Sequence, residues 1–127
     1  MTGRLLLSGA AVALALFAPA FGQFAGVWDT NLGRMNLTQD GNHVHGEYDR
    51  NGGRLDADVD QHDLTGLWVQ GDSEHRCRDK QADSHYWGHF HLHLDDNGKV
   101  FHGYRSLCDG EPASGGEWRG WRVDAGH

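Results

Sequence analysis

The sequence predicts an all-β fold, an antiparallel eight-stranded up-and-down barrel, from three observations. A motif of an apolar residue, any residue, a glycine and a nearby aromatic recurs along the chain. Its first copies place Gly26, Gly46 and Gly66 at intervals of 20 residues, about the length of one β-hairpin. Glycine is abundant, with 19 residues, and proline is rare, with 2. No stretch keeps an apolar period of about 3.6 residues, so long helices are not expected.

The N-terminal segment of the chain has the composition of a signal peptide. Arg4 provides a basic start, the run from Leu5 to Phe17 is apolar but short for a membrane span, and Ala18-Pro19-Ala20 fits a signal-peptidase site. We therefore expect residues 1–22 to be a secretory signal peptide and residues 23–127 to form a single barrel domain. The mature protein should be periplasmic or secreted, with no membrane span.

Turn residues divide this domain into strands. Asp40-Gly41-Asn42, Asn51-Gly52-Gly53 and Asp95-Asp96-Asn97-Gly98 supply residues that tolerate positive φ, as hairpin turns require. Asp60-Gln61-His62-Asp63 is a weaker turn signal. The strands expected between these turns and the longer loops cover residues 24–30, 34–39, 43–49, 54–60, 63–70, 85–94, 99–106 and 116–123.

Alternation gives each strand one apolar and one polar face. In strand 85–94, for example, Phe90, Leu92 and Leu94 point the same way, and a turn at Asn97-Gly98 pairs Leu94 with Phe101 in the same layer. An open meander has two exposed edges, which closure into a barrel removes. The inward glycines let strongly coiled strands approach each other, which favours the barrel over the alternative, a two-sheet β-sandwich.

A second hairpin brings histidines opposite carboxylates. A two-residue turn at Asn51-Gly52 pairs Tyr48 with Leu55, so that His43 faces Asp60 on the outward side. The outward histidines and carboxylates of this hairpin are a candidate set for holding a divalent ion; they are His43, His45, Asp56, Asp58 and Asp60. Opposite charges across strands also stabilise a sheet without any metal.

Connections in a meander alternate between the two ends of the strands. The long connections 71–84 and 107–115 fall at the same end and carry Cys77 and Cys108. Two cysteines in an exported chain are expected to form a disulfide. Long loops over one end of a barrel commonly form a binding site, so we expect the mouth at this end.

The charge balance narrows the class of partner. Eleven Lys and Arg residues stand against 18 Asp and Glu, for a formal net charge of −7. An acidic surface without a basic patch weighs against nucleic acid and against anionic membranes. The expected partner is a small molecule or a metal ion.

The opening of the domain resembles the avidin family. Gly26-Val-Trp28, Leu32-Gly33 and Gly46-Glu-Tyr48 are similar to that family's Gly-x-Trp strand, Leu-Gly turn and Gly-x-Tyr second hairpin. The likeness covers residues 24–48, and the rest shares only the general pattern of lipocalin-like barrels. It implies an eight-stranded barrel with Tyr48 in the position of a ligand-binding tyrosine.

Two positions depart from the avidin pattern. Thr30 stands where the family has asparagine, and Arg34 stands where it has serine. Because a buried polar ligand with unpaired groups loses about 1–3 kcal/mol per group, tight biotin binding is not expected. Trp68 is one of the tryptophans that either line a pocket or fill the core. The candidate ligand-binding residues are Thr30, Arg34, Tyr48 and Trp68.

Histidines form the other candidate site. His89, His91 and His93 alternate along one strand and so point the same way, while the Asn97-Gly98 turn places His102 across from His93. Neutral imidazoles at this spacing are ligands for Zn²⁺, Cu²⁺ or Ni²⁺. An outward strand face is also polar when no metal binds, so both interpretations remain open.

Three functions therefore follow from the sequence. The first is a non-enzymatic binding protein that holds a small ligand at the loop-rich mouth. The second is a periplasmic metal-binding protein that uses the histidine face. The third, a metal-dependent enzyme on the same histidines, is least favoured because the sequence has no nucleophile–base spacing and no phosphate loop.

Overall fold

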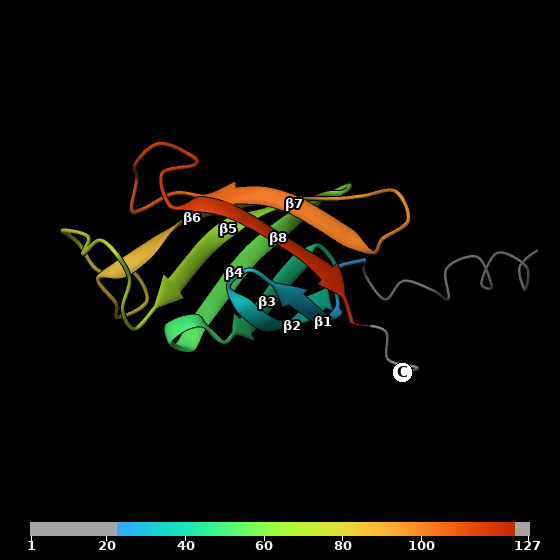
Figure 1. Ribbon diagram of the computed structural model, residues 1–127, viewed down its shortest axis with the longest axis horizontal. Coiled ribbons are helices and arrows are strands. Elements are labelled where there is room, and N and C mark those ends of the chain that lie inside the picture. The colour runs from blue at the N-terminus through green and yellow to red at the C-terminus, as the bar shows by residue number, and fades with distance from the viewer. Residues whose placement is uncertain (1–22, 124–127) are drawn as a thin grey trace, which may run out of the picture.

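In a computed structural model, residues 23–123 form a closed barrel of eight antiparallel strands (Figure 1). The predicted signal peptide, residues 1–22, and residues 124–127 lie outside the described residues. No helix in the described part of the chain is long and apolar enough to cross a membrane. The elements are β1 (Gly26–Thr30), β2 (Gly33–Asp40), β3 (His43–Tyr48), the short 3₁₀ helix η1 (Arg50–Gly52), β4 (Gly53–Asp60), β5 (Asp63–Gln70), β6 (Tyr86–Leu94), β7 (Val100–Arg105) and β8 (Gly116–Arg122).

Pairing of the first strand with the last closes the barrel. Each strand pairs with its neighbour in sequence, and β1 also pairs with β8 through Trp28 opposite Arg122 and Thr30 opposite Gly120. No edge strand is left in this sheet, which is the advantage that closure offers over an open meander. The predicted barrel is confirmed, and the β-sandwich alternative is wrong.

The inward side chains fill the barrel. The recurring glycines lie where neighbouring strands come close: a Cβ on Gly103 would lie 1.9 Å from the carbonyl oxygen of His91. Aromatic rings pack against each other in the interior, as Trp28 does against Phe101 at 5.1 Å between ring centres. The buried core consists of Phe24, Trp28, Leu32, Met35, Leu37, Val44, Tyr48, Leu55, Ala57, Leu64, Trp68, Phe90, Leu92, Leu94, Phe101 and Trp118.

One predicted register is wrong by two residues. Tyr48 pairs with Gly53 rather than Leu55, and His43 pairs with Asp58 rather than Asp60. The cause is the longer connection through η1, in which the ring of Tyr48 covers Gly53; a Cβ there would lie 2.2 Å from the ring. Because the shift is even, every side chain keeps its predicted face.

The register across the β6–β7 turn agrees with the prediction. Leu94 pairs with Phe101, and His93 pairs with His102. The turn has its glycine, Gly98, at a φ of 74°, in the region that glycine adopts without strain.

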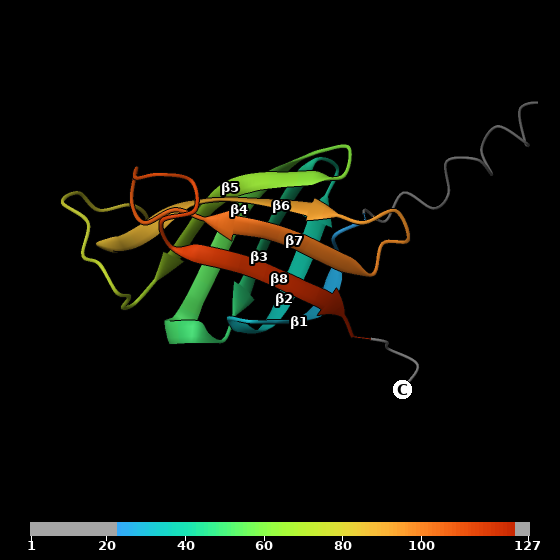
Figure 2. The same cartoon turned by 45° about the horizontal axis from the view of Figure 1, so that its top comes forward.

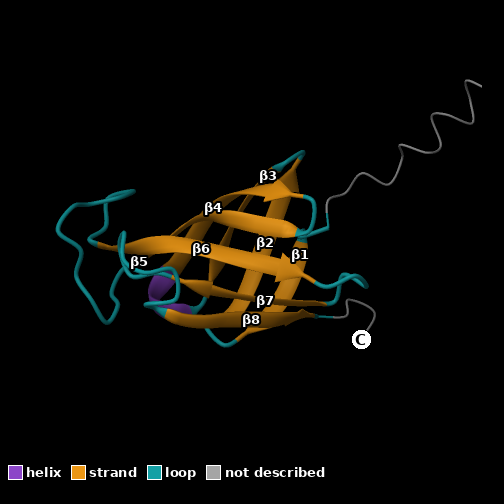
Figure 3. Cartoon of the chain, turned by 90° about the horizontal axis from the view of Figure 1, so that it is seen from above, coloured by secondary structure: helices purple, strands orange, loops and turns teal. Residues whose placement is uncertain are grey.

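The two ends of the barrel differ. The tight β2–β3, β4–β5 and β6–β7 turns share one end, where the guanidinium of Arg122 lies 4.3 Å from the centre of the Trp28 ring and donates to backbone carbonyls. The β5–β6 loop (residues 71–85) and the β7–β8 loop (residues 106–115) extend from the other end, together with η1 (Figures 1, 2 and 3). This loop-rich end is the mouth.

Candidate functional site

Buried polar side chains gather at the mouth. Within residues 23–123 the buried polar or charged residues are Gln70, Arg105 and Ser106, each 2–3% exposed. Gln70 ends β5, and Arg105 ends β7 with Ser106 directly after it, so all three lie at the loop-rich end. The interior, which is otherwise packed with hydrophobic and aromatic side chains, is therefore polar at this end.

Arg105 is the central residue of this cluster. It points inward because it follows Phe101 and Gly103 at alternate positions of β7. Its guanidinium carbon lies 4.6 Å from the centre of the Trp68 ring, in a cation–π arrangement. Its Nη2 donates to Glu74 Oε2 over 3.3 Å, while Nε and Nη1 are buried and find no acceptor among residues 23–123.

Tyr48 forms the second part of the cluster. Its hydroxyl donates to Gln70 Oε1 over 2.9 Å, and Gln70 Nε2 donates to the carbonyl of Asp72 over 2.8 Å. Burial raises the pKa of Tyr48 above its ordinary value, and the charges of Arg105 and Arg50 offset only part of that effect. Tyr48 is therefore a neutral hydrogen-bond donor at physiological pH.

Glu74 reaches this cluster from the β5–β6 loop, with its side chain 51% exposed. Two opposing effects act on the pKa of Glu74, and burial is the one that raises it. Hydrogen bonds from Ser73 and from the backbone, together with the charge of Arg105, outweigh that effect and hold the pKa below its ordinary value. Glu74 therefore presents a carboxylate to Arg105 at neutral pH.

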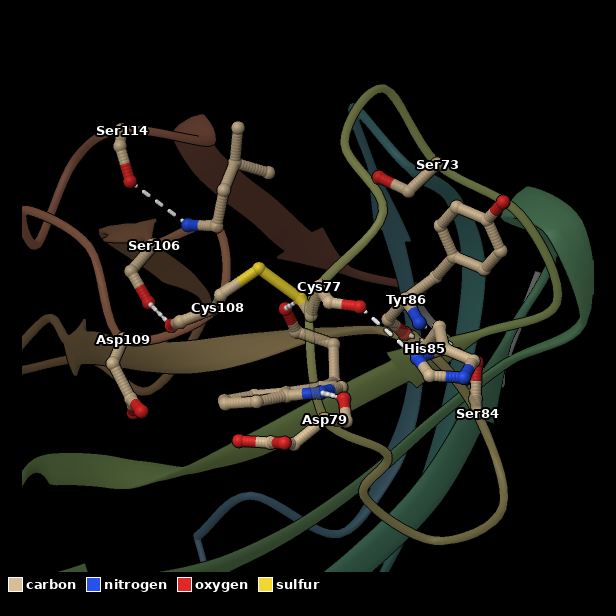
Figure 4. Close-up of a disulfide and its surroundings, with 12 residues drawn as sticks. Ser73, Cys77, Asp79, Ser84, His85, Tyr86, Ser106, Cys108, Asp109 and Ser114 are labelled. Carbon is tan, nitrogen blue, oxygen red and sulfur yellow. Dashed lines mark hydrogen bonds between the residues drawn. A yellow bond between two sulfur atoms is a disulfide. The ribbon is translucent and has the colours of Figure 1, made fainter.

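The predicted disulfide between Cys77 and Cys108 is present and joins the two mouth loops (Figure 4). The Cα atoms of the two residues are 5.7 Å apart. Cys77 is buried with Val69 and Trp87 in a small second core on the outer side of the sheet. The β5–β6 loop is thus anchored outside the barrel by its cysteine, while Glu74 contacts Arg105 inside the mouth.

A hollow of about 470 Å³ opens beside the cluster, between η1 and the β5–β6 loop. Gln70 lines it and also binds Tyr48, so the hollow adjoins the buried polar groups. Arg54, Arg76 and Asp83 line it as well, so positive charge is in excess there in a chain of formal charge −7. A wider hollow of about 600 Å³ lies on the outer face of β2–β5, but the polar side chains around it are exposed and already solvated.

Two of the four predicted ligand-binding residues lie in the buried cluster, Tyr48 and Trp68. Thr30 Oγ1 donates to the carbonyl of Gly33 over 2.7 Å and so belongs to the β1–β2 turn at the mouth. Arg34 lies on the outer face, where its Nη2 is 2.9 Å from Asp29 Oδ1 and its side chain is 57% exposed. The structure does not bring Arg34 to the other three.

Gln70, Glu74 and Arg105 were not among the site residues predicted from the sequence. Strand alternation places Gln70 in phase with Trp68, and it places Arg105 in phase with Phe101, so both were detectable as polar residues on an apolar face. Glu74 lies in an irregular loop, where no periodic pattern indicates its position.

The four candidate metal-binding histidines lie on the outer face of β6 and β7. Asp63 Oδ1 accepts from His91 Nε2 over 2.9 Å and from His93 Nδ1 over 3.0 Å, and these hydrogen bonds lower the pKa of Asp63. His89 and His102 also lie on this face. Among residues 23–123, no group of three or more His, Cys, Asp or Glu side chains is arranged to hold a metal ion.

Fold and site together define an all-β barrel with a polar mouth beneath two disulfide-linked loops. A comparison of this chain with protein-family models, curated proteins and solved structures found no match in any of the three.

Proposed function

We propose that this protein is an exported, non-enzymatic binding protein that holds a small molecule at the mouth of its barrel. The observation that carries this proposal is the gathering of buried polar side chains at the loop-rich end. An unsatisfied buried polar group costs about 1–3 kcal/mol, a cost that an apolar core would avoid. A few polar groups in apolar and aromatic surroundings are also what orients a ligand in a binding pocket.

The surroundings of the cluster support this proposal. The rings of Trp68 and Tyr48 are buried beside hydrogen-bonding groups, and the Trp118 ring packs edge-on to Tyr48 at 5.0 Å. The avidin-like opening of the chain supports the same end of the barrel, because its matching tyrosine is Tyr48. Export is supported by the predicted signal peptide and by the disulfide, which persists in oxidising compartments.

The proposal is tested by thermal-shift measurements against a panel of neutral, cationic and anionic small molecules. At least one compound should raise the melting temperature, and Tyr48→Phe should reduce that shift because it removes the hydroxyl bonded to Gln70. Tyr104→Phe is the matched control, since Tyr104 is 38% exposed and lies outside the cluster. If no compound stabilises the protein, or if both variants respond alike, the proposal fails.

Metal binding on the outer face of β6 and β7 is a second candidate function, and it requires the histidine side chains there to move from the positions described above, in which no group of three among residues 23–123 is arranged to hold a metal ion. It is favoured by the direct pairing of His93 with His102 and by Asp63, a carboxylate that contacts two of the histidines. Calorimetric titration with Zn²⁺, Cu²⁺ and Ni²⁺ tests it. Equal binding by a variant with alanine at His89, His91, His93 and His102 would exclude this site.

A further inference from the structure

The guanidinium of Arg105 is only partly used by the protein. Its side chain is 4% exposed, so water does not replace missing partners as it does at the surface. Of its three nitrogens, Nη2 alone has a hydrogen bond within the described part of the chain, to a single oxygen of Glu74, and Nε and Nη1 have none there. A guanidinium has five N–H donors in a planar fork, and a carboxylate typically accepts two parallel bonds from it.

The surroundings hold this fork in place. Its guanidinium carbon lies 4.6 Å from the centre of the Trp68 ring, and Trp68 Nε1 donates to the carbonyl of Ser106 over 3.0 Å, which fixes the ring. Gly115 lies close against the aliphatic part of Arg105, as a Cβ added to Gly115 would be 3.1 Å from Arg105 Cγ. A donor group that is already ordered loses little entropy when it binds a ligand, so Arg105 is preorganised.

Glu74, in contrast, is held weakly. Its contact with Arg105 is a single hydrogen bond of 3.3 Å, and its side chain is half exposed. It lies in a segment, residues 71–76, in which every residue but Ser73 is exposed, before the anchored Cys77. Hydrogen bonds from Gln70 and Asn51 hold the backbone of this segment at Asp72, so the part that moves is the Glu74 side chain. Turning that side chain away from Arg105 exposes little buried surface, so its displacement costs little free energy.

We infer that the ligand of the mouth carries a carboxylate, which binds Arg105 in the place that the Glu74 carboxylate takes in this structure. Glu74 then acts as an internal competitor that occupies Arg105 until the ligand displaces it. Arg54, Arg76 and Asp83 line the hollow beside Gln70, and the excess of positive charge there favours the approach of an anion. This inference rests on the proposed function and adds to it a chemical class and a displaced side chain.

The test compares carboxylates with their own amides. Benzoate, phenylacetate and octanoate are titrated calorimetrically into the oxidised protein, alongside benzamide, phenylacetamide and octanamide. The acids should bind about tenfold or more tightly than the amides, since charge-assisted hydrogen bonds are roughly twice as strong as neutral ones.

Glu74→Gln is the central variant, because it keeps the side chain's shape and removes the competing charge. It should tighten carboxylate binding several-fold, whereas Glu111→Gln, a charge removal at an exposed position of the β7–β8 loop, should leave it unchanged. Arg105→Gln should abolish the preference for acids over amides, and Arg105→Lys, which keeps the charge but not the fork, should reduce it. Circular dichroism identifies any Arg105 variant that does not fold, and the Glu74→Gln result then decides alone.

The two proposals fail in different ways. If amides bind as tightly as acids and Glu74→Gln has no effect, the carboxylate inference is overturned and a small-molecule site at the mouth stands. If neither series binds and no compound of the broader panel stabilises the protein, both are overturned.

Discussion

Removal of the Cys77–Cys108 disulfide gives a quantitative test of how the mouth is stabilised. The bond closes a loop with a sequence separation of 31 residues. For a loop of that length, the chain-entropy relation gives an unfolded-state entropy loss of about 12 cal/mol/K, or about 3.7 kcal/mol at 25 °C. A variant with alanine at both positions should therefore be less stable by about 3–4 kcal/mol.

This loss is large for a barrel of this size. Small domains have unfolding free energies of about 5–15 kcal/mol, and each kcal/mol shifts the melting temperature of a domain of about 100 residues by roughly 4–8 °C. The variant should remain folded at 25 °C and melt about 15 °C or more below the oxidised protein. Loss of packing by Cys77 against Val69 and Trp87 adds to the entropic term rather than opposing it.

Guanidinium-chloride unfolding at 25 °C measures the difference. The oxidised protein, the protein treated with dithiothreitol and the Cys77→Ala/Cys108→Ala variant are compared, and the variant should be insensitive to dithiothreitol. A loss of less than about 1 kcal/mol would refute the reasoning, because it would mean that the bond restricts neither the unfolded chain nor the loops.

Three further predictions concern the barrel itself. Gly103→Ala should lower the free energy of unfolding by about 2–3 kcal/mol, because the new Cβ would lie 1.9 Å from a backbone oxygen. Gly71→Ala is the control and should change it little, since its new Cβ would lie 3.4 Å from the nearest atom. Urea unfolding of both variants measures the difference. Arg122→Ala should cost about 2–4 kcal/mol in the same assay, since it removes hydrogen bonds to three backbone carbonyls and the stacking on Trp28, and a loss under about 1 kcal/mol would contradict that role. The pKa of Asp63 is lowered in the fold by hydrogen bonds from His91 and His93, so its contribution is present above its ordinary pKa of 3.8 and is lost as the pH falls through the folded value. Urea midpoints at pH 6, 4 and 3 should therefore fall more steeply in the native protein than in Asp63→Asn, and parallel curves would count against this linkage.

Local patterns were sufficient to predict the fold. Alternation within each strand and glycine-containing turns are properties of neighbouring residues, and they correctly indicate eight strands, their faces and the His93–His102 pairing. The connection after Tyr48 was mispredicted for a physical reason. The strands are joined through the 3₁₀ turn η1, in which Asn51 and Gly52 have φ values of 50° and 65°, and a two-residue turn motif does not encode that longer connection.

The site was less predictable because its parts come from different kinds of structure. Tyr48 and Trp68 were found through motifs. The inward position of Arg105 was predictable from strand alternation, which places this charged residue on the apolar face of β7. Glu74 is brought to Arg105 by the fold of an irregular loop. The pairing of these two charges is therefore a result of tertiary structure alone.

The contrast between Arg105 and the histidine face shows why burial decides which polar residues are informative. His89, His93 and His102 are exposed, and a polar residue on an outward strand face is already solvated, so its presence needs no ligand to explain it. Arg105 has lost its hydration, and two of its nitrogens have gained no protein partner in exchange. Burial of a charged group with unused donors costs free energy, so stability alone does not account for the presence of Arg105. The binding role proposed above accounts for it, because a ligand carboxylate would supply an acceptor that the described part of the fold does not.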